Sequence, residues 1–226
     1  MIGNFVLVGV IGYLLGSIPF GLIISRRFAK VDVRQYGSGK IGTTNVLRTA
    51  GRKAAALVFA LDLLKGSAAV ALARPIIGEG YFEFSTFHWG VLAAQVIAAL
   101  MAMVGHSRSV FLGFKGGGRG VSTFFGGLAA LLPPVALFGG EVFIIGAGLS
   151  KFASLASISA AVSTYAIVIP LTILNRFPVE YLIYTLAGTV MIIITHRDNI
   201  SRLWSNKERK LGDQAQSKDL TPTAPS

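Results

Sequence analysis

The sequence contains no cysteine and few charged residues. None of its 226 residues is Cys, and only 14% are Asp, Glu, Lys or Arg. The absence of cysteine excludes disulfide bonds and thiolate chemistry. A soluble domain carries about 25% charged residues, so this chain has too few charges to cover a water-exposed surface. With 53% hydrophobic residues and a mean hydropathy of +0.65, the composition indicates one membrane domain.

Acidic residues are scarce as well, at 10 against 21 basic ones, for a formal net charge of +11. In a membrane protein such an excess gathers in cytoplasmic loops that face anionic headgroups, which favours a lipid surface over a nucleic-acid partner. The sequence has no GxSxG motif, no His followed four positions later by Asp, and no cluster with metal-ligand spacing. We therefore expect neither a metal ion nor a cofactor.

Long apolar segments make up most of the chain, and a membrane-spanning helix needs about 20 such residues. They predict an all-α protein with about seven transmembrane helices, at 2–25, 54–77, 87–104, two passes within 121–149, 152–174 and 179–195. Pro133-Pro134 splits 121–149 into two apolar pieces, which could be one broken span, a re-entrant pair or two short spans, and the basic tail favours two passes. Gly12 and Gly16 are four residues apart and predict a small-residue face for close helix packing.

The loop 26–53 and the tail after Thr195 are both basic, which places them on the cytoplasmic side and the N-terminus outside. Residues 1–211 form the predicted membrane domain, and 212–226 a disordered cytoplasmic tail.

The stretch Gly105–Thr123, GHSRSVFLGFKGGGRGVST, joins two apolar segments by a basic, glycine-rich loop. Glycines let the backbone approach a ligand closely, and successive N–H groups in such loops form anion-binding concavities. The pattern predicts a phosphate or carboxylate site at the membrane surface, and the alternative is a tight basic turn. Its candidate binding residues are His106, Lys115, Gly116, Gly117 and Arg119.

A second glycine-rich segment, GSGKIGTTN, lies in the first polar loop. Its GxGxxG spacing is a weak dinucleotide signal here, because a membrane span and not a strand precedes it. The segment also feeds a predicted helix start, where free N–H groups favour an anion. The candidate phosphate ligands are Ser38, Gly39, Thr43, Asn45 and Arg48, and the alternative for the polar side chains is ordinary helix capping.

Polar side chains also follow the last span, in HRDNISRLWSNKERKL. His196 and Asn199 are three residues apart and share a helix face, and Glu208 follows a predicted turn. The alternative is a basic amphipathic helix that lies on anionic lipid. Asp62, His196 and Glu208 are the only candidates for a general base.

Ionisable residues within a span usually face a bundle interior, a cavity or a partner. Asp62 and Lys65 are three residues apart on one helix face, so they form either a structural ion pair or part of the site. Ser17 lies beside a helix-interrupting proline, and its role is structural or secondary.

The three polar motifs, in this order, resemble the signature motifs of the bacterial acyl-phosphate:glycerol-3-phosphate acyltransferases. GSIPFG at 16–21 and LDLLKG at 61–66 resemble further landmarks of that family. The resemblance implies an inner-membrane enzyme that transfers a fatty acyl group from acyl phosphate to the 1-hydroxyl of sn-glycerol 3-phosphate. The products would be lysophosphatidic acid and phosphate, in the first step of phospholipid synthesis. It also implies contact with membrane lipid and functional coupling to the enzyme that makes acyl phosphate.

The resemblance implies phosphate-binding roles for the residues of the first two motifs, and the catalytic candidates are His196, Asn199, Glu208 and Lys115. FKGGGRGV contains one glycine more than the usual family pattern FKGGKGV, so the sequence leaves open whether Lys115 or Arg119 fills the main cation role.

A competing hypothesis is a membrane transporter of a small phosphorylated or carboxylated solute. The polar motifs gather at one membrane face, however, whereas transporter sites lie near the midplane.

Overall fold

The computed structural model describes residues 1–78, 82–84 and 87–215. Within them the chain is helical apart from two short strands. The helices are α1 (Ile2–Ser17), α2 (Phe20–Ala29), α3 (Thr43–Ile77), α4 (Val91–Ser107), α5 (Val121–Leu131), α6 (Pro133–Ser150), α7 (Ala153–Ile173), α8 (Val179–Thr195) and α9 (Arg197–Trp204). Two 3₁₀ turns (Val33–Gln35 and Val110–Leu112) and the antiparallel strands β1 (Phe82–Phe84) and β2 (Phe87–Trp89) complete it.

The all-α membrane architecture predicted from the sequence is confirmed. In the described residues, five helical segments are long and apolar enough to cross a membrane, or six if α8 and α9 count as one span with a 60° bend. The predicted count of seven is not confirmed, because α5 has only 11 residues and a span needs about 20. Residues 216–226 of the predicted disordered tail lie outside the described residues.

The structure corrects one boundary of the predicted spans. The third span was expected to begin at residue 87, but residues Phe87–Trp89 form β2 and α4 begins at Val91. The Pro133-Pro134 pair was expected to divide residues 121–149, and it does so, because Pro133 begins α6 directly after α5 ends at Leu131. Proline suits the first helical turn, where its missing N–H is not needed.

Glycines on the facing sides of helices allow close packing in the bundle. The predicted small-residue face at Gly12 and Gly16 lies against the backbone of Ala98 and Ala102 in α4, and a Cβ at either glycine would overlap that backbone. In the same way, Gly126 of α5 lies against the α3 backbone. Without a strong hydrophobic drive between helices in lipid, such close approach supplies the van der Waals contact that holds them together.

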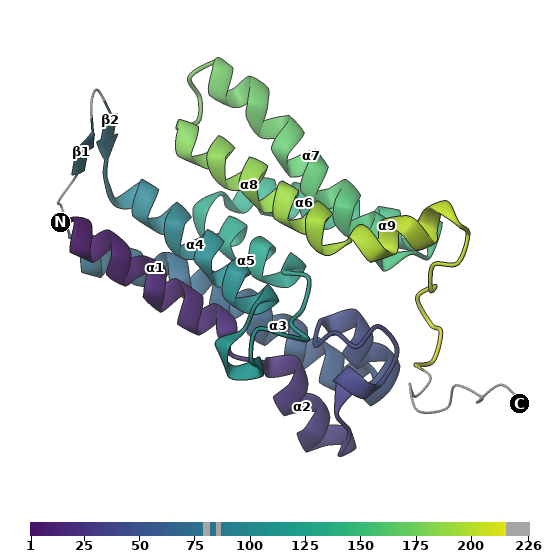
Figure 1. The fold of residues 1–226 in the computed structure, drawn as a ribbon. Coiled ribbons are helices and arrows are strands. Elements are labelled where there is room, and N and C mark those ends of the chain that lie inside the picture. The colour runs from purple at the N-terminus through teal and green to yellow at the C-terminus, as the bar shows by residue number, and fades with distance from the viewer. Residues whose placement is uncertain (79–81, 85–86, 216–226) are drawn as a thin grey trace, which may run out of the picture.

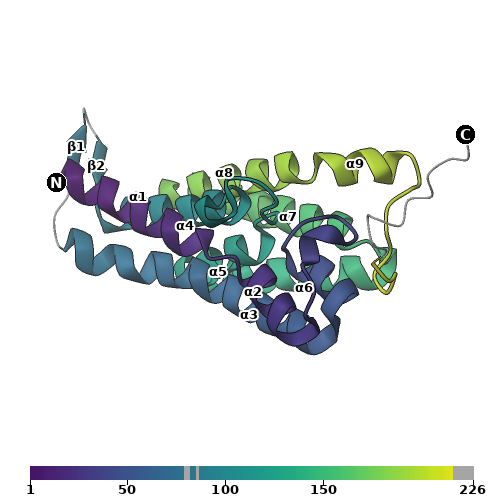
Figure 2. The same cartoon turned by 60° about the horizontal axis from the view of Figure 1, so that its bottom comes forward.

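The arrangement of the helices gathers the polar loops towards one end of the molecule. The N-terminus and the β1–β2 hairpin lie at one end, and α2, α9 and the C-terminal segment lie towards the other (Figure 1, Figure 2). Between these ends, the ring of Phe124 stacks on that of Tyr184 at 5.3 Å, and the buried Tyr184 hydroxyl donates to the Phe124 carbonyl. This contact fixes α5 against α8, and the loop that precedes α5 meets the end of α8, where Thr195 Oγ1 donates to the Arg119 carbonyl at 3.0 Å.

Candidate functional site

A cavity of about 690 Å³ lies between the helices and the polar loops, within the usual size range of small-molecule sites. One part of its wall is polar and includes the two glycine-rich loops, α9 and the C-terminal segment. The other part is apolar and comes from α3, α5 and α6, with Phe59, Leu63, Phe125, Ala129, Pro133, Ala136, Leu137, Phe143 and Ile144. The cavity therefore suits a ligand with one charged and one hydrocarbon end.

Two helices begin in the wall of this cavity. The N-caps of α3 and α5 are Gly42 and Gly120, neither provides a side-chain cap, and both line the cavity. Gly120 has a φ of 83°, a conformation that glycine adopts without strain. The first N–H groups of both helices are thus not satisfied by cap side chains, and the positive ends of the two helix dipoles favour an anion there.

Asn45 organises the first glycine-rich loop. Its side-chain nitrogen donates to the carbonyls of Val33, Tyr36 and Lys40 at 2.9–3.1 Å, and its Oδ1 accepts from the Ser38 N–H at 3.2 Å. The amide is therefore committed to the loop, although Asn45 also lines the cavity. It acts by holding Ser38 and Lys40 in place.

The second glycine-rich loop brings Arg119, and not Lys115, to the cavity. Arg119 lines the wall, whereas the Lys115 side chain is exposed and outside it. A Cβ at Gly117 would overlap the Ser107 carbonyl, and one at Gly118 would overlap the His106 ring. Gly117 and Gly118 therefore let the loop pack on the end of α4, and the role of Gly116 and Gly117 in cradling phosphate stays a prediction.

The polar wall has an excess of positive charge. Burial lowers the pKa of Arg119 to about 10, and the neighbouring Glu208 partly offsets this. Burial also lowers the pKa of Lys40, and the charge of Arg119 lowers it further. Two basic side chains at one cavity wall, of which one lowers the pKa of the other, favour a bound anion there.

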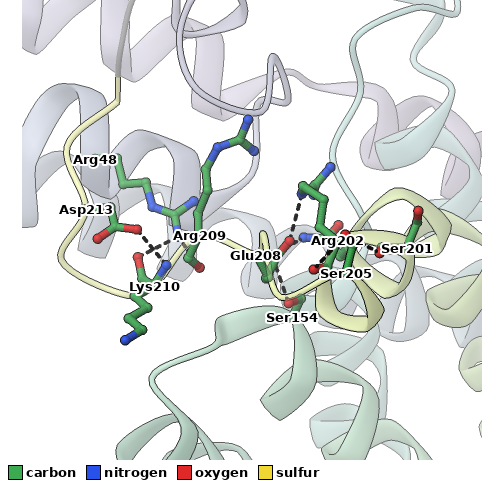
Figure 3. Close-up of polar contacts among 10 residues, drawn as sticks. Arg48, Ser154, Ser201, Arg202, Ser205, Glu208, Arg209, Lys210 and Asp213 are labelled. Carbon is green, nitrogen blue, oxygen red and sulfur yellow. Dashed lines mark hydrogen bonds and ion pairs between the residues drawn. The ribbon is translucent and has the colours of Figure 1, made fainter.

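Glu208 joins the third motif to α7. Its carboxylate accepts hydrogen bonds from Ser154 Oγ at 3.0 Å, Asn199 Nδ2 at 2.5 Å and Arg202 Nε at 2.8 Å, as Figure 3 shows for Ser154 and Arg202. The carboxylate is 5% exposed. With these three donors, Glu208 fixes the positions of Ser154 and Asn199 at the cavity wall.

His196 lines the same part of the wall. Its Nδ1 lies 2.8 Å from the Ile192 carbonyl. That contact requires the proton on Nδ1, so Nε2 of the neutral ring is an acceptor.

Asp62 and Lys65 form a buried ion pair, with 2.8 Å between Lys65 Nζ and Asp62 Oδ1. Asp62 lines the cavity and lies 3.5 Å from Nδ1 of His106. Lys65 also donates to the carbonyl of Ile18 at 3.1 Å, in the break between α1 and α2. The pair thus connects the break between α1 and α2 to the wall of the cavity.

Several buried polar atoms of the cavity wall have no hydrogen-bond partner among the described residues. Asp62 Oδ1 and His106 Nδ1 are among them but lie in the contacts with Lys65 and with each other described above, and the four others are Thr43 Oγ1, Arg48 Nε, Arg119 Nε and Asn199 Oδ1. Buried polar groups in native proteins nearly always have a partner. Four such atoms around one cavity are expected where a polar ligand supplies the missing hydrogen bonds.

Most of the predicted site residues come together in this cavity, although they lie far apart in the sequence. Those that line it are Ser38, Thr43, Asn45, Arg48, Asp62, His106, Arg119, His196, Asn199 and Glu208. Those that are not in its lining are Ser17, Gly39, Lys65, Lys115, Gly116 and Gly117. Within the described residues, no group of three or more His, Cys, Asp or Glu could hold a metal ion.

Sequence reasoning missed Ser154 and the apolar wall. Ser154 lies in a run of small residues that indicates only helix packing, and its place depends on α7 meeting the C-terminal segment. The apolar residues of α3, α5 and α6 carry no signal that separates cavity-lining from lipid-facing positions. Lys40 also lines the cavity and was not among the predicted ligands. It lies in the first glycine-rich loop, and its positive charge was the feature that could have indicated a role in the site.

Comparison with known proteins adds a family to this geometry. The sequence model described as glycerol-3-phosphate acyltransferase matches residues 6–206. The chain is 56% identical to glycerol-3-phosphate acyltransferase 3 of Dehalococcoides mccartyi, over 95% of this chain and 99% of the relative. It is 43% identical to a glycerol-3-phosphate acyltransferase of a Synechococcus species, over 90% of this chain and 91% of the relative.

Two solved structures resemble the fold. Both are crystal structures of PlsY (YgiH), an integral membrane glycerol 3-phosphate acyltransferase. The glycerol 3-phosphate form is 35% identical, with a TM-score of 0.77 over 92% of this chain and 96% of that chain. The lysophosphatidic acid form is 34% identical, with a TM-score of 0.76 over 92% and 95%.

Proposed function

The chain belongs to the glycerol-3-phosphate acyltransferase family, and from this premise we propose that it uses acyl phosphate as the acyl donor. The reaction transfers a fatty acyl group to the 1-hydroxyl of sn-glycerol 3-phosphate and releases lysophosphatidic acid and inorganic phosphate. Family membership also favours an enzyme over the transporter that the sequence left as a competing hypothesis.

The observation that supports this proposal best is the two-part wall of the cavity. Lys40, Arg48 and Arg119, together with the N-termini of α3 and α5, offer positive charge to phosphate groups. The apolar wall of α3, α5 and α6 offers a place for an acyl chain. Two residues of this apolar wall, Leu137 and Ile144, are each 71% exposed on the outside of α6. The acyl chain can therefore enter the cavity sideways from the bilayer.

We propose direct transfer within this site. The hydroxyl oxygen of glycerol 3-phosphate attacks the acyl carbonyl carbon, the bond between that carbon and the phosphate oxygen breaks, and phosphate leaves. Holding both substrates by their phosphates converts a bimolecular step into one within the site. Arg119 and the helix N-termini stabilise the negative charge that develops on the carbonyl and phosphate oxygens.

The proton of the attacking hydroxyl passes to the leaving phosphate. Glu208 already accepts three hydrogen bonds, so it serves as a positioning residue for Ser154 and Asn199. Neutral His196, with its proton on Nδ1, can accept a hydrogen bond from the substrate hydroxyl through Nε2 and orient it. A covalent acyl-enzyme trapped on a side chain such as Ser38 would contradict this direct transfer.

We further propose that the protein lies in the bacterial inner membrane with its N-terminus outside and its site at the cytoplasmic face. The absence of native cysteine allows a clean test, because a membrane-impermeant maleimide then labels only an introduced thiol. Gly3→Cys should be labelled in intact cells and Ser205→Cys only after lysis. The opposite pattern would reverse the orientation.

The test of the activity is phosphate release by the purified protein in lipid. The assay supplies palmitoyl phosphate with and without glycerol 3-phosphate, and mass spectrometry identifies the lipid product. Acceptor-dependent release with formation of lysophosphatidic acid is the expected result. Activity with palmitoyl-coenzyme A or palmitoyl-acyl carrier protein, and none with palmitoyl phosphate, would show that the proposed acyl donor is wrong.

A further inference from the structure

The C-terminal segment after α9 links two walls of the cavity. We call residues 207–215 the strap. On one side, Glu208 contacts Ser154 of α7, and the Leu211 N–H donates to the Lys151 carbonyl in the turn between α6 and α7 at 2.7 Å. On the other side, the strap lies against the first turns of α3, as Figure 3 shows around Arg48.

Arg48 is the contact on the α3 side. Its Nη2 donates to the backbone carbonyls of Arg209 at 3.2 Å and Lys210 at 2.9 Å. In return, the Arg48 carbonyl accepts from the Ala215 N–H at 3.4 Å. The guanidinium is thus held from outside by two backbone groups, while the same side chain lines the cavity.

The way in which the strap holds Arg48 leaves its charge available. Both strap acceptors are neutral carbonyls and both use Nη2, whereas Nε is buried without a partner among the described residues. The strap has two carboxylates, and neither has a hydrogen bond from Arg48: Glu208 accepts from Ser154, Asn199 and Arg202, and Asp213 accepts from the Lys210 N–H. An arginine held by carbonyls keeps its positive charge for an anion, whereas one paired with a carboxylate would not.

We propose that the strap is a positioning element for acyl transfer, and that the Arg209 and Lys210 carbonyls hold the Arg48 guanidinium so that Nε meets a substrate phosphate. A free arginine side chain loses rotamer entropy when it is fixed, and the strap removes that loss from the binding step. The inference rests on the proposed function. It concerns a segment beyond residue 206, where the match to the family sequence model ends.

The test compares two truncations of the full chain in lipid. A stop after Glu208 removes both carbonyls and keeps the Glu208 side chain, whereas a stop after Ala215 keeps the whole strap. We expect the shorter protein to show a KM about 10-fold higher for glycerol 3-phosphate or palmitoyl phosphate, with kcat within about 3-fold. The longer one should match wild type within about 2-fold.

Point variants give a second reading that does not depend on truncation. Leu211→Pro removes the N–H that anchors the strap to Lys151, and Leu211→Ala keeps it. The proline variant should raise the same KM and the alanine variant should not. Thermal melting of each protein in detergent separates these effects from unfolding.

A double-mutant cycle decides whether the strap acts through Arg48. If it does, the stop after Glu208 adds less than 2-fold in an Arg48→Ala background. Three results would overturn the proposal: a full additional loss in the Arg48→Ala background, an unchanged KM of the shorter truncation, or an increase in its activity. An increase would mean that the strap is an inhibitory cover. Failure of the proposed function looks different, because wild type and the longer truncation would then also be inactive with palmitoyl phosphate.

Discussion

The two glycine-rich loops look alike in sequence but contribute to the cavity in different ways. The first loop (36–42) lines it with Ser38, Lys40 and Gly42, and it keeps its shape through the side chain of Asn45. The second loop (113–120) reaches it only with its last two residues, Arg119 and Gly120. Gly117 and Gly118, just before them, contact the end of α4.

The difference teaches that a glycine run can serve close packing as well as ligand contact. Gly118 allows the backbone to lie on the His106 ring, because any Cβ there would overlap that ring. This packing holds the loop so that the residue after it points into the cavity. In FKGGGRGV the first cation, Lys115, is exposed, and the second, Arg119, lines the cavity.

The largest predicted effect tests this assignment of the two cations. Arg119→Ala removes a buried charge from the polar end of the cavity and, on the proposed function, should lower kcat/KM about 100-fold or more, since a charge-stabilising donor is worth about 2.7–4 kcal/mol in the transition state. Lys115→Ala is the matched control and should lower it less than 3-fold. Steady-state assays with palmitoyl phosphate measure both. A larger loss for Lys115→Ala would reverse the assignment.

The second prediction concerns packing in the same loop. Gly118→Ala places a methyl group in the His106 ring and should destabilise the protein by about 2 kcal/mol, in the range known for overpacked sites. At Gly116, where φ is 73° and the nearest group is the flexible Arg34 side chain, alanine should cost only about 1 kcal/mol of backbone strain. Chemical unfolding in detergent compares the two. Equal effects would show that the loop does not depend on the His106 contact.

The first loop should depend on one side chain instead of on packing. Asn45→Ala removes the hydrogen bonds to two carbonyls and one N–H of that loop and to the Val33 carbonyl before it, and we expect about a 10-fold loss of kcat/KM as Ser38 and Lys40 lose their positions. Asn45→Asp keeps the acceptor but not the donors and should lose nearly as much. Protease accessibility of the loop, followed by mass spectrometry, should rise in both variants. An active Asn45→Ala with a protected loop would contradict this role.

These contrasts mark what the sequence could predict. Apolar segment lengths and glycine spacing anticipated the helical membrane fold and the close packing at Gly12 and Gly16, because both follow from local chemistry. The choice between Lys115 and Arg119 depends on how the loop packs against His106, which is a tertiary contact without a local signal. The position of Ser154 likewise depends on Glu208, 54 residues away. Sequence patterns therefore found the motifs, and packing decided which atoms of each motif reach the cavity.

The smallest predicted effect is at the contact between the second loop and the residues just before the first loop. Arg34 packs its side chain beside Gly116 and pairs with Asp32 at 2.6 Å, and Arg26 pairs with the same carboxylate at 2.8 Å. The hydrogen bond from Arg34 is the main reason that the pKa of Asp32 lies well below its usual range. Because Arg26 and Arg34 are 58% and 36% exposed, solvent screens the pairs, and Asp32→Asn should cost only about 1 kcal/mol.

The pH dependence of that effect has a definite sign. Asp32 has a lower pKa in the folded than in the unfolded protein, so its contribution is present above the ordinary Asp value of about 3.9 and is lost as the pH falls below it. The stability difference between wild type and Asp32→Asn should therefore be full at pH 6–8 and shrink towards pH 3. It should also shrink in 1 M salt, where the Debye length falls to about 3 Å. Thermal melting across this series measures it, and a difference that grows on acidification would mean that the carboxylate does not stabilise the loops as an ion.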